Sequence, residues 1–322
     1  MERIAIICSG GDCQGMNACI KTIVRTCETH NIIPIAVNRG YAGLIENDMS
    51  FLNHDMVENI DNLGGAFIKV SRSKEFTTPA GLKKAVANLK KNKIDGVIIL
   101  GGNGSFKGAE NLVKHGINVI AIPATIDNDL FYTDRSLGFD TAVNNAVNAI
   151  DSIRQTISAT DRGLVVEVMG RDCGAIALNT AFATCAHALA CKELNTTIKD
   201  VVADVKKIMQ YGITSPVVVV SENCDFRVAD IQNALEKELK IVTRSSVLGY
   251  LLRGGAPSVL DRILAINFGI TAVELLISGQ YNLALGTNDN KVFACPLAQA
   301  NKVKQHFDYA SVKKLRKLYN LD

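Results

Sequence analysis

Short apolar runs alternate along this chain with longer stretches of helical periodicity, and this alternation constrains the fold more than any other feature. In the first part of the chain the apolar runs cover residues 4–8, 33–37, 96–100 and 118–122, and the helical stretches cover 17–29, 82–90 and 105–115. After residue 138 the pattern starts again, with apolar runs at 164–168 and 216–220 and helical stretches at 141–158, 198–211, 229–240 and 261–278. Such alternation is typical of α/β units around a parallel sheet. The sequence therefore predicts an α/β protein in two halves, the first of which ends near Gly138.

Length and charge exclude several classes of protein. The chain has 322 residues, which suits one large domain or two ordinary ones. Its formal net charge is only +3, whereas nucleic-acid binding usually requires a strongly basic face. The N-terminus lacks the basic start and cleavage site of a secretory signal, and no apolar run approaches the roughly 18 residues of a membrane helix. We expect a soluble, cytoplasmic protein that binds neither nucleic acid nor a membrane.

The cysteines and histidines show no spacing typical of a metal or disulfide framework. The nine cysteines are odd in number and include no Cys-x-x-Cys pair, and the five histidines are scattered singly. Most of the cysteines lie in apolar stretches, where a free thiol packs as a small hydrophobic group. We therefore expect them to be structural.

Three polar turns follow predicted strands in the first half, and ligands of open parallel sheets bind at such carboxyl ends. The turns at 9–17 and 101–105 are rich in glycine and open helices, which suits close approach of a phosphate. Neither has the Gly-x-Gly-x-x-Gly or Gly-Lys-Ser/Thr pattern, so each is a weak signal alone and a nicotinamide dehydrogenase is disfavoured. The third turn contains Asp127 and Asp129, which could divide the roles of proton acceptor and metal anchor in phosphoryl transfer. An ordinary Asx-rich turn would have the same composition.

The second half contains several arginines beside predicted strand ends or glycine turns, together with one methionine and one carboxylate. The group comprises Arg162, Met169, Arg171, Glu222, Arg244 and Arg253. Guanidinium forks suit phosphate oxygens, although a lone surface arginine is more often simply solvated. Several arginines at sheet ends, with Glu222 opposite them, favour an anionic sugar ligand.

Taken together, these segments resemble the bacterial-type ATP-dependent 6-phosphofructokinase family. The motifs that carry the resemblance stand in family order at 9–17, 40–44, 101–105, 125–129, 138–142, 167–171 and 252–255. The resemblance implies two Rossmann-like domains with parallel-rich sheets sandwiched by helices. An ATP-binding large domain would comprise 1–138 plus 256–305, and a sugar-phosphate-binding small domain 139–255 plus 306–322. It also implies a homotetramer that uses Mg²⁺ and ATP to phosphorylate fructose 6-phosphate in glycolysis.

The resemblance also implies roles for individual residues. Asp127 would be the base that takes the proton of the sugar's 1-hydroxyl, and the other catalytic candidates are Thr125, Asp129, Arg171, Gly11 and Arg72. The nucleotide candidates are Gly11, Tyr41, Arg72, Ser73, Gly102, Asn103, Gly104, Ser105 and Gly108. The sugar-phosphate candidates are Thr125, Asp127, Asp129, Arg162 (from a neighbouring subunit), Met169, Gly170, Arg171, Glu222, Arg244, Tyr250 and Arg253. Asp129 and, more weakly, Asn103 are the metal candidates, and Lys21, Arg25 and Arg154 are candidates for an effector phosphate. Gly104 and Ala124 resemble the ATP-using type, because pyrophosphate-using relatives have Asp and Lys there.

Some positions depart from the family pattern. Asn103 stands where the family has an Asp that serves Mg²⁺-ATP, and the neutral amide attracts Mg²⁺ less. Tyr250 stands where a His contacts the sugar 6-phosphate, and a phenol cannot become cationic. In the effector region, His54, Ile213 and His187 replace an Arg, a Lys and a Glu, so classical effector regulation is not expected. Two alternatives follow: a low-activity paralogue that acts as a regulatory subunit or sugar-phosphate sensor, and a kinase of another sugar phosphate.

Overall fold

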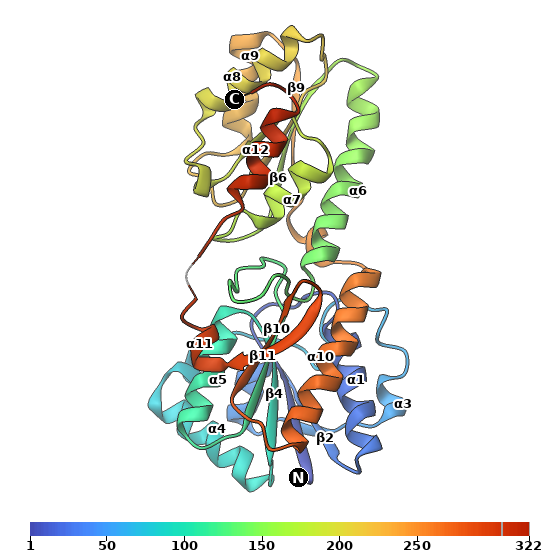
Figure 1. Ribbon diagram of the computed structural model, residues 1–322, viewed down its shortest axis with the longest axis vertical. Coiled ribbons are helices and arrows are strands. Elements are labelled where there is room, and N and C mark those ends of the chain that lie inside the picture. Colours follow the sequence, from blue (N-terminus) through green and yellow to red (C-terminus); the bar gives the residue numbers. More distant parts are fainter. Residues whose placement is uncertain (304, 322) are drawn as a thin grey trace. The chain divides into compact units, whose positions relative to one another are not determined.

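The computed structural model describes residues 1–303 and 305–321. The chain divides into two compact units (Figure 1). Unit 1 comprises Met1–Thr141 and Arg253–Lys304, and unit 2 comprises Ala142–Leu252 and Gln305–Asp322.

Unit 1 is built on a mostly parallel sheet. Its described strands, in spatial order, are β11 (Lys291–Pro296), β10 (Leu283–Asn288), β5 (Val119–Pro123), β4 (Gly96–Gly101), β1 (Arg3–Cys8), β2 (Ile33–Val37) and β3 (Met49–Phe51). Strands β10, β5, β4, β1 and β2 run parallel, and β3 and β11 pair antiparallel at the two edges. β4 and β5 are buried along their whole lengths, because helices cover both faces of a parallel sheet.

Helices cover both faces of this sheet (Figure 1). The helical segments of unit 1 are α1 (Met16–Thr29), α2 (Gly40–Glu46), α3 (His54–Val57), η1 (Glu75–Thr77), α4 (Pro79–Lys91), α5 (Asn103–Lys114), α10 (Val259–Ile277) and α11 (Leu297–Ala300). α1 and α10 pack together on one face, and α4 and α5 lie on the other. The core under α4 and α5 includes Ile7, Val97 and Phe106, all fully buried.

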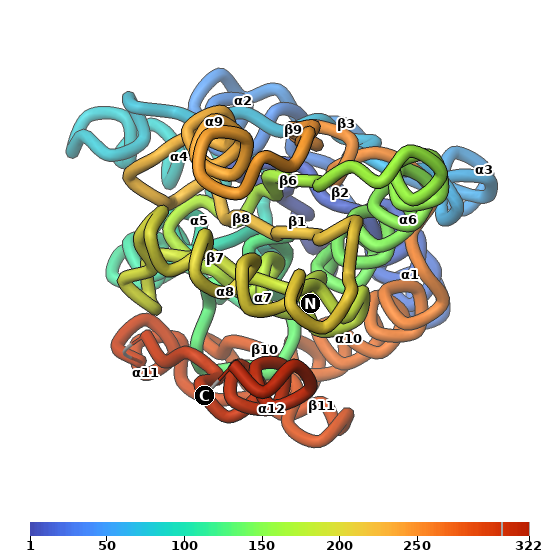
Figure 2. The backbone as a smooth tube through the Cα atoms, turned by 90° about the horizontal axis from the view of Figure 1, so that it is seen from above, coloured from blue at the N-terminus to red at the C-terminus, as the bar shows by residue number. Residues whose placement is uncertain are grey.

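Unit 2 repeats the plan with a smaller sheet, whose described strands are all parallel. The strand order is β7 (Ala188–Ala190), β8 (Val217–Ser221), β6 (Gly163–Val168) and β9 (Thr243–Val247), and the view from above shows this order (Figure 2). The helical segments are α6 (Phe139–Ser158), which begins in unit 1, α7 (Ala175–Ala183), η2 (Lys192–Leu194), α8 (Ile198–Gln210), α9 (Val228–Leu239), η3 (Gly249–Arg253), which ends in unit 1, and α12 (Tyr309–Lys317). Val165, Val205 and Leu235 join β6, α8 and α9 in one core.

The structure confirms the predicted fold class of α/β layers around parallel-rich sheets. All nine cysteines lie within the described residues, and each is a free thiol. Among residues 1–303 and 305–321 we find no helix whose length and hydrophobicity would let it span a lipid bilayer.

Candidate functional site

The three polar turns of unit 1 start at neighbouring parallel strands. β5, β4 and β1 are adjacent in the sheet, so their carboxyl ends lie at the same edge. The chain passes from β1 to β2 on one side and later places β4 on the other, which makes the gap between β1 and β4 a topological switch point. Ligands of open α/β sheets bind at such points.

The two glycine turns pack directly against each other at this switch point. The backbone N–H of Ser9 donates to the carbonyl of Leu100 at 3.0 Å, and the Ser105 hydroxyl donates to the carbonyl of Ser9 at 2.8 Å. A side chain at Gly101 would place its Cβ 2.3 Å from Ser105 Oγ and 2.6 Å from the Ser9 carbonyl oxygen. Position 101 therefore requires glycine for this close approach of backbone to backbone.

Tyr41 supports these turns from within the core. Its hydroxyl donates to the carbonyl of Ser105 at 2.7 Å, and its ring stacks on Phe76 with 3.9 Å between ring centroids. The ring leaves no room for a side chain at Gly108, whose Cβ would lie 2.6 Å from it. Because Tyr41 is only 5% exposed, its side chain acts on the first turn of α5 and presents little surface to a ligand.

The first turn of α5 presents backbone donors to an anion, although the N–H of Ser105 already donates to the carbonyl of Gly102 at 2.9 Å. Gly102 is the N-cap, and Asn103, Gly104 and Ser105 form the first turn. The leading N–H groups of a helix have no intrahelical acceptor and carry the positive end of its dipole. Gly104 is exposed, and a Cβ added there meets no atom within 4 Å. The space beside Gly104 is therefore open in this chain.

The turn after β5 holds the catalytic candidate Asp127 in a constrained backbone. Asp127 is 8% exposed, and its backbone N–H donates to Thr125 Oγ1 at 3.2 Å. The next residue, Asn128, has a φ of 49°, in the left-handed region that asparagine tolerates better than most residues. Asn128 Oδ1 accepts from the backbone N–H of Ser136 at 2.9 Å. Asp127 is thus carried on a turn fixed by its own neighbours.

Asn103 reaches across from α5 to the same turn. Its amide nitrogen lies 2.7 Å from Asp129 Oδ2 and 3.1 Å from the Asp129 carbonyl oxygen. The structure describes no cluster of three or more His, Cys, Asp or Glu side chains suited to a metal ion. Mg²⁺ is commonly held by one or two carboxylates together with substrate phosphates, so Asp129 with the Asn103 amide oxygen fits an ion that arrives with a nucleotide.

Arg253 lies in unit 1, over the first glycine turn. Its Nη1 is 3.3 Å from Asp12 Oδ1, and a Cβ at Gly11 would lie 2.6 Å from that Nη1. The absence of a side chain at Gly11 lets the guanidinium pack on the turn in this position. The contact with Asp12 has no local sequence signal, since 241 positions separate the two residues. Of the remaining nucleotide candidates, Arg72 is exposed, and Ser73 Oγ accepts from the backbone N–H of Phe76 at 3.1 Å.

Several of the sugar-phosphate candidates lie in unit 2, at the carboxyl edge of its sheet. Met169, Gly170 and Arg171 follow β6, Glu222 follows β8, and Tyr250 follows β9. Glu222 Oε1 accepts from the backbone N–H groups of Gly170 at 3.0 Å and Arg171 at 2.6 Å. Burial, and then the charge of Glu222, raises the pKa of Glu167. Tyr250 is 83% exposed.

Arg162 and Arg244 lie at the opposite edge of the same sheet. Arg162 directly precedes β6, and Arg244 pairs with Leu164 near the beginning of that strand. At about 3.3 Å per residue, the strand separates the two edges by roughly 15–20 Å. Within one chain, these two arginines are therefore not brought together with Glu222 and Met169.

The effector candidates Lys21 and Arg25 already have acidic partners. Lys21 Nζ lies 2.9 Å from Asp61 Oδ1, and Arg25 pairs with Glu58. Arg25 first and Lys21 second hold the pKa of Glu58 below its ordinary value, and Lys21 lowers the pKa of Asp61. These acidic partners were not predicted from the sequence. These carboxylates already neutralise the positive charges of Lys21 and Arg25, which an effector phosphate would otherwise neutralise.

His187 and Arg154, in unit 2, are also engaged. Arg154 donates to the carbonyl of Thr184 at 2.7 Å. His187 Nδ1 accepts from the backbone N–H of Val217 at 2.9 Å, and its ring packs against Tyr319 with 5.0 Å between centroids. Burial, and then the charge of Arg154, lowers the pKa of His187 to about 4. His187 is therefore a neutral structural side chain at physiological pH.

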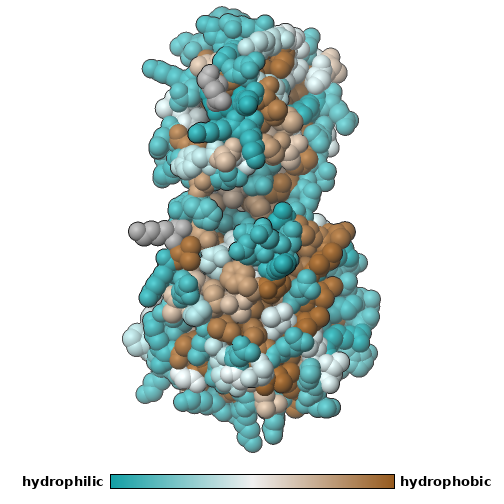
Figure 3. All heavy atoms as spheres, viewed as in Figure 1, coloured by the Kyte–Doolittle hydropathy of each residue, from teal (hydrophilic) through white to brown (hydrophobic). Residues whose placement is uncertain are grey.

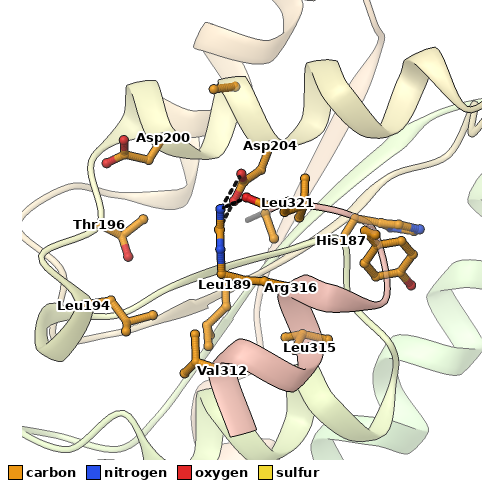
Figure 4. A pocket seen from close by; sticks show the side chains of 13 residues that line it. His187, Leu189, Leu194, Thr196, Asp200, Asp204, Val312, Leu315, Arg316 and Leu321 are labelled. Atoms are coloured by element: carbon orange, nitrogen blue, oxygen red, sulfur yellow. Dashed lines mark hydrogen bonds and ion pairs between the residues drawn. The ribbon is translucent and has the colours of Figure 1, made fainter. Parts of the chain in front are cut away.

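Unit 2 also has a cavity of about 550 Å³ between β7, α8 and α12 (Figure 4). Arg316 Nη1 extends across it to Asp204 Oδ2 at 2.7 Å, between walls that include Leu189 and Val312. None of the sugar-phosphate candidates lines this cavity, so it does not coincide with the candidate site.

The chain matches a known protein family over most of its length. The sequence profile of the family described as phosphofructokinase matches residues 3–276. The chain belongs to the phosphofructokinase family. It is 41% identical over 308 residues to a protein named ATP-dependent 6-phosphofructokinase from Clostridioides difficile (strain 630), and the match covers 96% of each chain.

Solved structures of the family share this fold. Phosphofructokinase from Saccharomyces cerevisiae superposes with a TM-score of 0.87 and 28% identity, covering all of this chain and 48% of that one. The chain therefore spans about half the length of the yeast chain it matches. A pyrophosphate-dependent phosphofructokinase from Marinobacter aquaeolei has a TM-score of 0.84 and 22% identity, over 96% of this chain and 86% of that one. That likeness concerns the fold alone, so overall structure does not separate ATP-using from pyrophosphate-using family members.

Proposed function

We propose that this protein is an ATP-dependent 6-phosphofructokinase, which transfers the terminal phosphoryl group of ATP to the 1-hydroxyl of fructose 6-phosphate in glycolysis. The observation that carries the proposal is the near full-length match, at 41% identity, to a relative of that name. The buried Asp127 beside two glycine turns supports it, because phosphoryl transfer to a hydroxyl needs a carboxylate next to a phosphate site.

The proposed reaction uses the turns of unit 1. The first turn of α5 and the turn of residues 9–15 bind the ATP phosphates through backbone N–H groups. Asp127 accepts the proton of the sugar hydroxyl. The hydroxyl oxygen of the sugar forms the new bond to phosphorus, while the bond from phosphorus to the ADP oxygen breaks. Asp129 and Asn103 would hold Mg²⁺ beside the phosphates, where the ion supplies charge neutralisation. Thr125 braces Asp127 through the 3.2 Å hydrogen bond to its backbone.

The open space at Gly104 supports ATP as the donor. A nucleotide has an inner phosphate that pyrophosphate lacks, and a side chain at position 104 would project into the exposed region beside the first turn of α5. Nothing in the described chain fills this region within 4 Å of the added Cβ. We infer that Gly104 and Ala124 select ATP over pyrophosphate.

The sugar-phosphate side of the proposal draws on unit 2. Glu222, Met169 and Arg171 would contact the sugar at the carboxyl edge of the small sheet. Arg162 and Arg244 lie at the opposite edge, so they can grip a 6-phosphate held near Glu222 only if another copy of the chain supplies them. The placement of these arginines favours an oligomer with active sites shared between subunits, as in the expected homotetramer.

The surface of α10 supports assembly as well. Its outer face exposes Val259, Ile263, Ile266, Ile270 and Ile277, which appear as a brown band along the helix (Figure 3). A contiguous apolar face of this kind commonly marks a protein–protein contact.

Two other functions remain supported by single observations. The neutral Asn103 beside Asp129 favours a low-activity paralogue that acts as a regulatory subunit or sugar-phosphate sensor. The exposed Tyr250 favours a kinase of a different sugar phosphate, because the phenol changes the group available to the 6-phosphate.

The deciding experiment measures fructose 1,6-bisphosphate formation by the purified protein with Mg²⁺ and fructose 6-phosphate. ATP and pyrophosphate are offered separately. Product with ATP alone is the expected result. Product with pyrophosphate alone would contradict the donor assignment, and no product with either donor would favour the alternatives, to be separated by testing other sugar phosphates.

A further inference from the structure

Asp261 is a buried carboxylate in the first turn of α10, and it binds the beginning of another helix. The residue is 1% exposed. Its Oδ1 accepts from the backbone N–H of Gly138 at 3.1 Å, and its Oδ2 accepts from the backbone N–H of Thr141 at 2.9 Å and from the Thr141 hydroxyl. A buried charge is costly unless it is hydrogen-bonded, and three donors compensate this one.

The helices α6 and α10 cap each other through this contact. Asp261 supplies the acceptor for the N-terminal donors of α6, which are unpaired within the helix. In return, the backbone N–H of Ser258, the N-cap of α10, donates to Thr141 Oγ1 at 2.9 Å. The Ser258 hydroxyl also accepts from the backbone of Asp261 and donates to Asp140 Oδ2 at 2.6 Å. Residues 138–141 are thus fixed on α10 by a closed network.

The segment held by Asp261 is in turn paired with the turn that carries Asp127. The backbone N–H of Leu137 donates to the carbonyl of Pro123 at 2.9 Å, and that of Thr125 donates to the carbonyl of Leu137 at 3.1 Å. The Ser136 hydroxyl donates to the carbonyl of Thr125 at 2.6 Å. These hydrogen bonds, together with the one from Ser136 to Asn128, hold residues 136–137 along one side of the turn formed by residues 123–128.

We propose that Asp261 is a positioning residue for phosphoryl transfer, which fixes the turn bearing Asp127 by anchoring residues 136–141 to α10. The proposal rests on the proposed function, because it concerns the placement of that reaction's base. Asp261 accepts hydrogen bonds from Gly138 and Thr141, and it acts on the turn through these two residues. Misplacing a reacting group by about 1 Å can lower a rate by roughly 10²-fold, so the anchor is expected to matter for turnover.

Protonation of Asp261 should have opposite effects on stability and on activity. Asp140 on α6 and Cys13 in the first glycine turn are titratable groups that face it, and burial raises the pKa of Asp261 to about 6. A group whose pKa is raised on folding adds stability as the pH falls from about 6 toward its ordinary value near 4. The protonated carboxyl loses its negative charge and becomes a donor at one oxygen, which weakens the three hydrogen bonds that Asp261 accepts. Turnover should therefore fall in the range where stability rises.

The test compares Asp261→Asn with Thr141→Val, which removes only the hydroxyl, and Thr141→Ser, which keeps it. Asp200→Asn is the matched control, since Asp200 Oδ2 accepts from the backbone N–H and hydroxyl of Thr197 as Asp261 does from those of Thr141. We expect kcat to fall by about 10- to 100-fold in Asp261→Asn and less in Thr141→Val, with KM for ATP changing far less. Thr141→Ser and Asp200→Asn should keep the wild-type kcat.

Two further readouts separate positioning from a merely structural role. The part of the fall in wild-type kcat that begins near pH 6 should be absent from Asp261→Asn, at temperatures well below its Tm, so that only the fall due to protonation of the base Asp127 remains. Hydrogen–deuterium exchange of residues 123–141, measured without substrates, should speed up in Asp261→Asn and Thr141→Val but not in the two controls. If Asp261→Asn keeps the wild-type kcat and exchange, the positioning role is wrong.

The exchange measurement keeps this inference distinct from the proposed function. A wild-type protein that forms no fructose 1,6-bisphosphate, but whose turn loosens in Asp261→Asn, would refute the proposed reaction and support the anchor. A wild-type protein that is active, with kcat and exchange unaffected by both Asp261→Asn and Thr141→Val, would support the reaction and refute the anchor.

Discussion

The side-chain amide of Asn103 donates to Asp129 Oδ2 at 2.7 Å and to the Asp129 carbonyl at 3.1 Å, so a neutral donor stands beside the carboxylate proposed to serve Mg²⁺. In Asn103→Asp, two carboxylates would face each other at this distance and would need a cation between them. We expect the half-saturating Mg²⁺ concentration to fall and kcat to rise, by up to roughly 10²-fold for one restored electrostatic contact.

The melting temperature of the metal-free protein tests the contact between residues 103 and 129 without relying on catalysis. Asn103→Asp should melt at a lower temperature than wild type in EDTA, and Mg²⁺ with an ATP analogue should remove this difference. Asn103→Ala is the control, since it removes the amide without adding charge. Equal Mg²⁺ dependence in Asn103→Asp and wild type would mean that Asn103 belongs to a working variant site.

Gly104 gives a prediction about the phosphoryl donor. Gly104→Asp should fold as well as wild type, because the added side chain meets no atom within 4 Å and glycine is a poor helix residue. It should nevertheless lower kcat/KM for ATP by at least about 10²-fold, since its carboxylate would repel the nucleotide phosphates. Gly104→Ala serves as the steric control, with a smaller loss. Full ATP activity in Gly104→Asp, with an unchanged melting temperature, would exclude position 104 from donor selection.

Tyr250 gives a prediction about the sugar acceptor. The residue is 83% exposed after β9, so Tyr250→His should cost little stability. An imidazolium can pair with a 6-phosphate where a phenol can only donate one hydrogen bond. KM for fructose 6-phosphate should therefore fall in Tyr250→His, more strongly at pH 6 than at pH 8, while KM for ATP stays constant. Tyr250→Phe is the control for the hydroxyl, and an unchanged KM in Tyr250→His at both pH values would refute the role.

Most of the parallel core of the fold was predictable from the sequence, whereas β10 and the edge strands were not. β2 was expected at 33–37 and is Ile33–Val37, because a short run rich in β-branched residues and bounded by turn residues favours a strand. β9 reads Thr-Arg-Ser-Ser-Val and was not predicted, since an exposed edge strand has no apolar run. β10 and β11 were also not predicted, although the intervening Asp289 and Asn290, both at positive φ, form a recognisable hairpin turn.

The site was predictable as far as strand direction determines it. Asp127, Gly102 and Gly11 follow parallel strands, so their meeting at one edge follows from the fold. Arg244 could not be placed in the same way, because without β9 nothing indicated which end of a strand it occupies. The partners of Lys21 and Arg25 could not be predicted either, since Glu58 and Asp61 are distant in sequence and belong to no local pattern.

His187 leads to a prediction about the pH dependence of stability. Burial and Arg154 lower the pKa of its imidazole to about 4, from 6.5 in the unfolded chain, so folding favours the neutral form. The stability that this provides is complete above pH 6.5 and is lost as the pH falls toward 4. Because His187 is only partly buried, we expect the loss to be about 1–2 kcal/mol, less than the full shift would give.

The variant His187→Asn isolates this contribution, since its amide oxygen can still accept from Val217 but does not titrate. At pH 7.5 the variant should be less stable than wild type, because it loses the ring contact with Tyr319. That difference should shrink as the pH falls to 5, as wild type loses the stability of its neutral imidazole. Urea unfolding followed by circular dichroism at both pH values measures this difference in the free energy of unfolding. His115→Asn is the control, because His115 is exposed. A difference that stays constant between pH 7.5 and 5 would mean that His187 titrates normally in the folded protein.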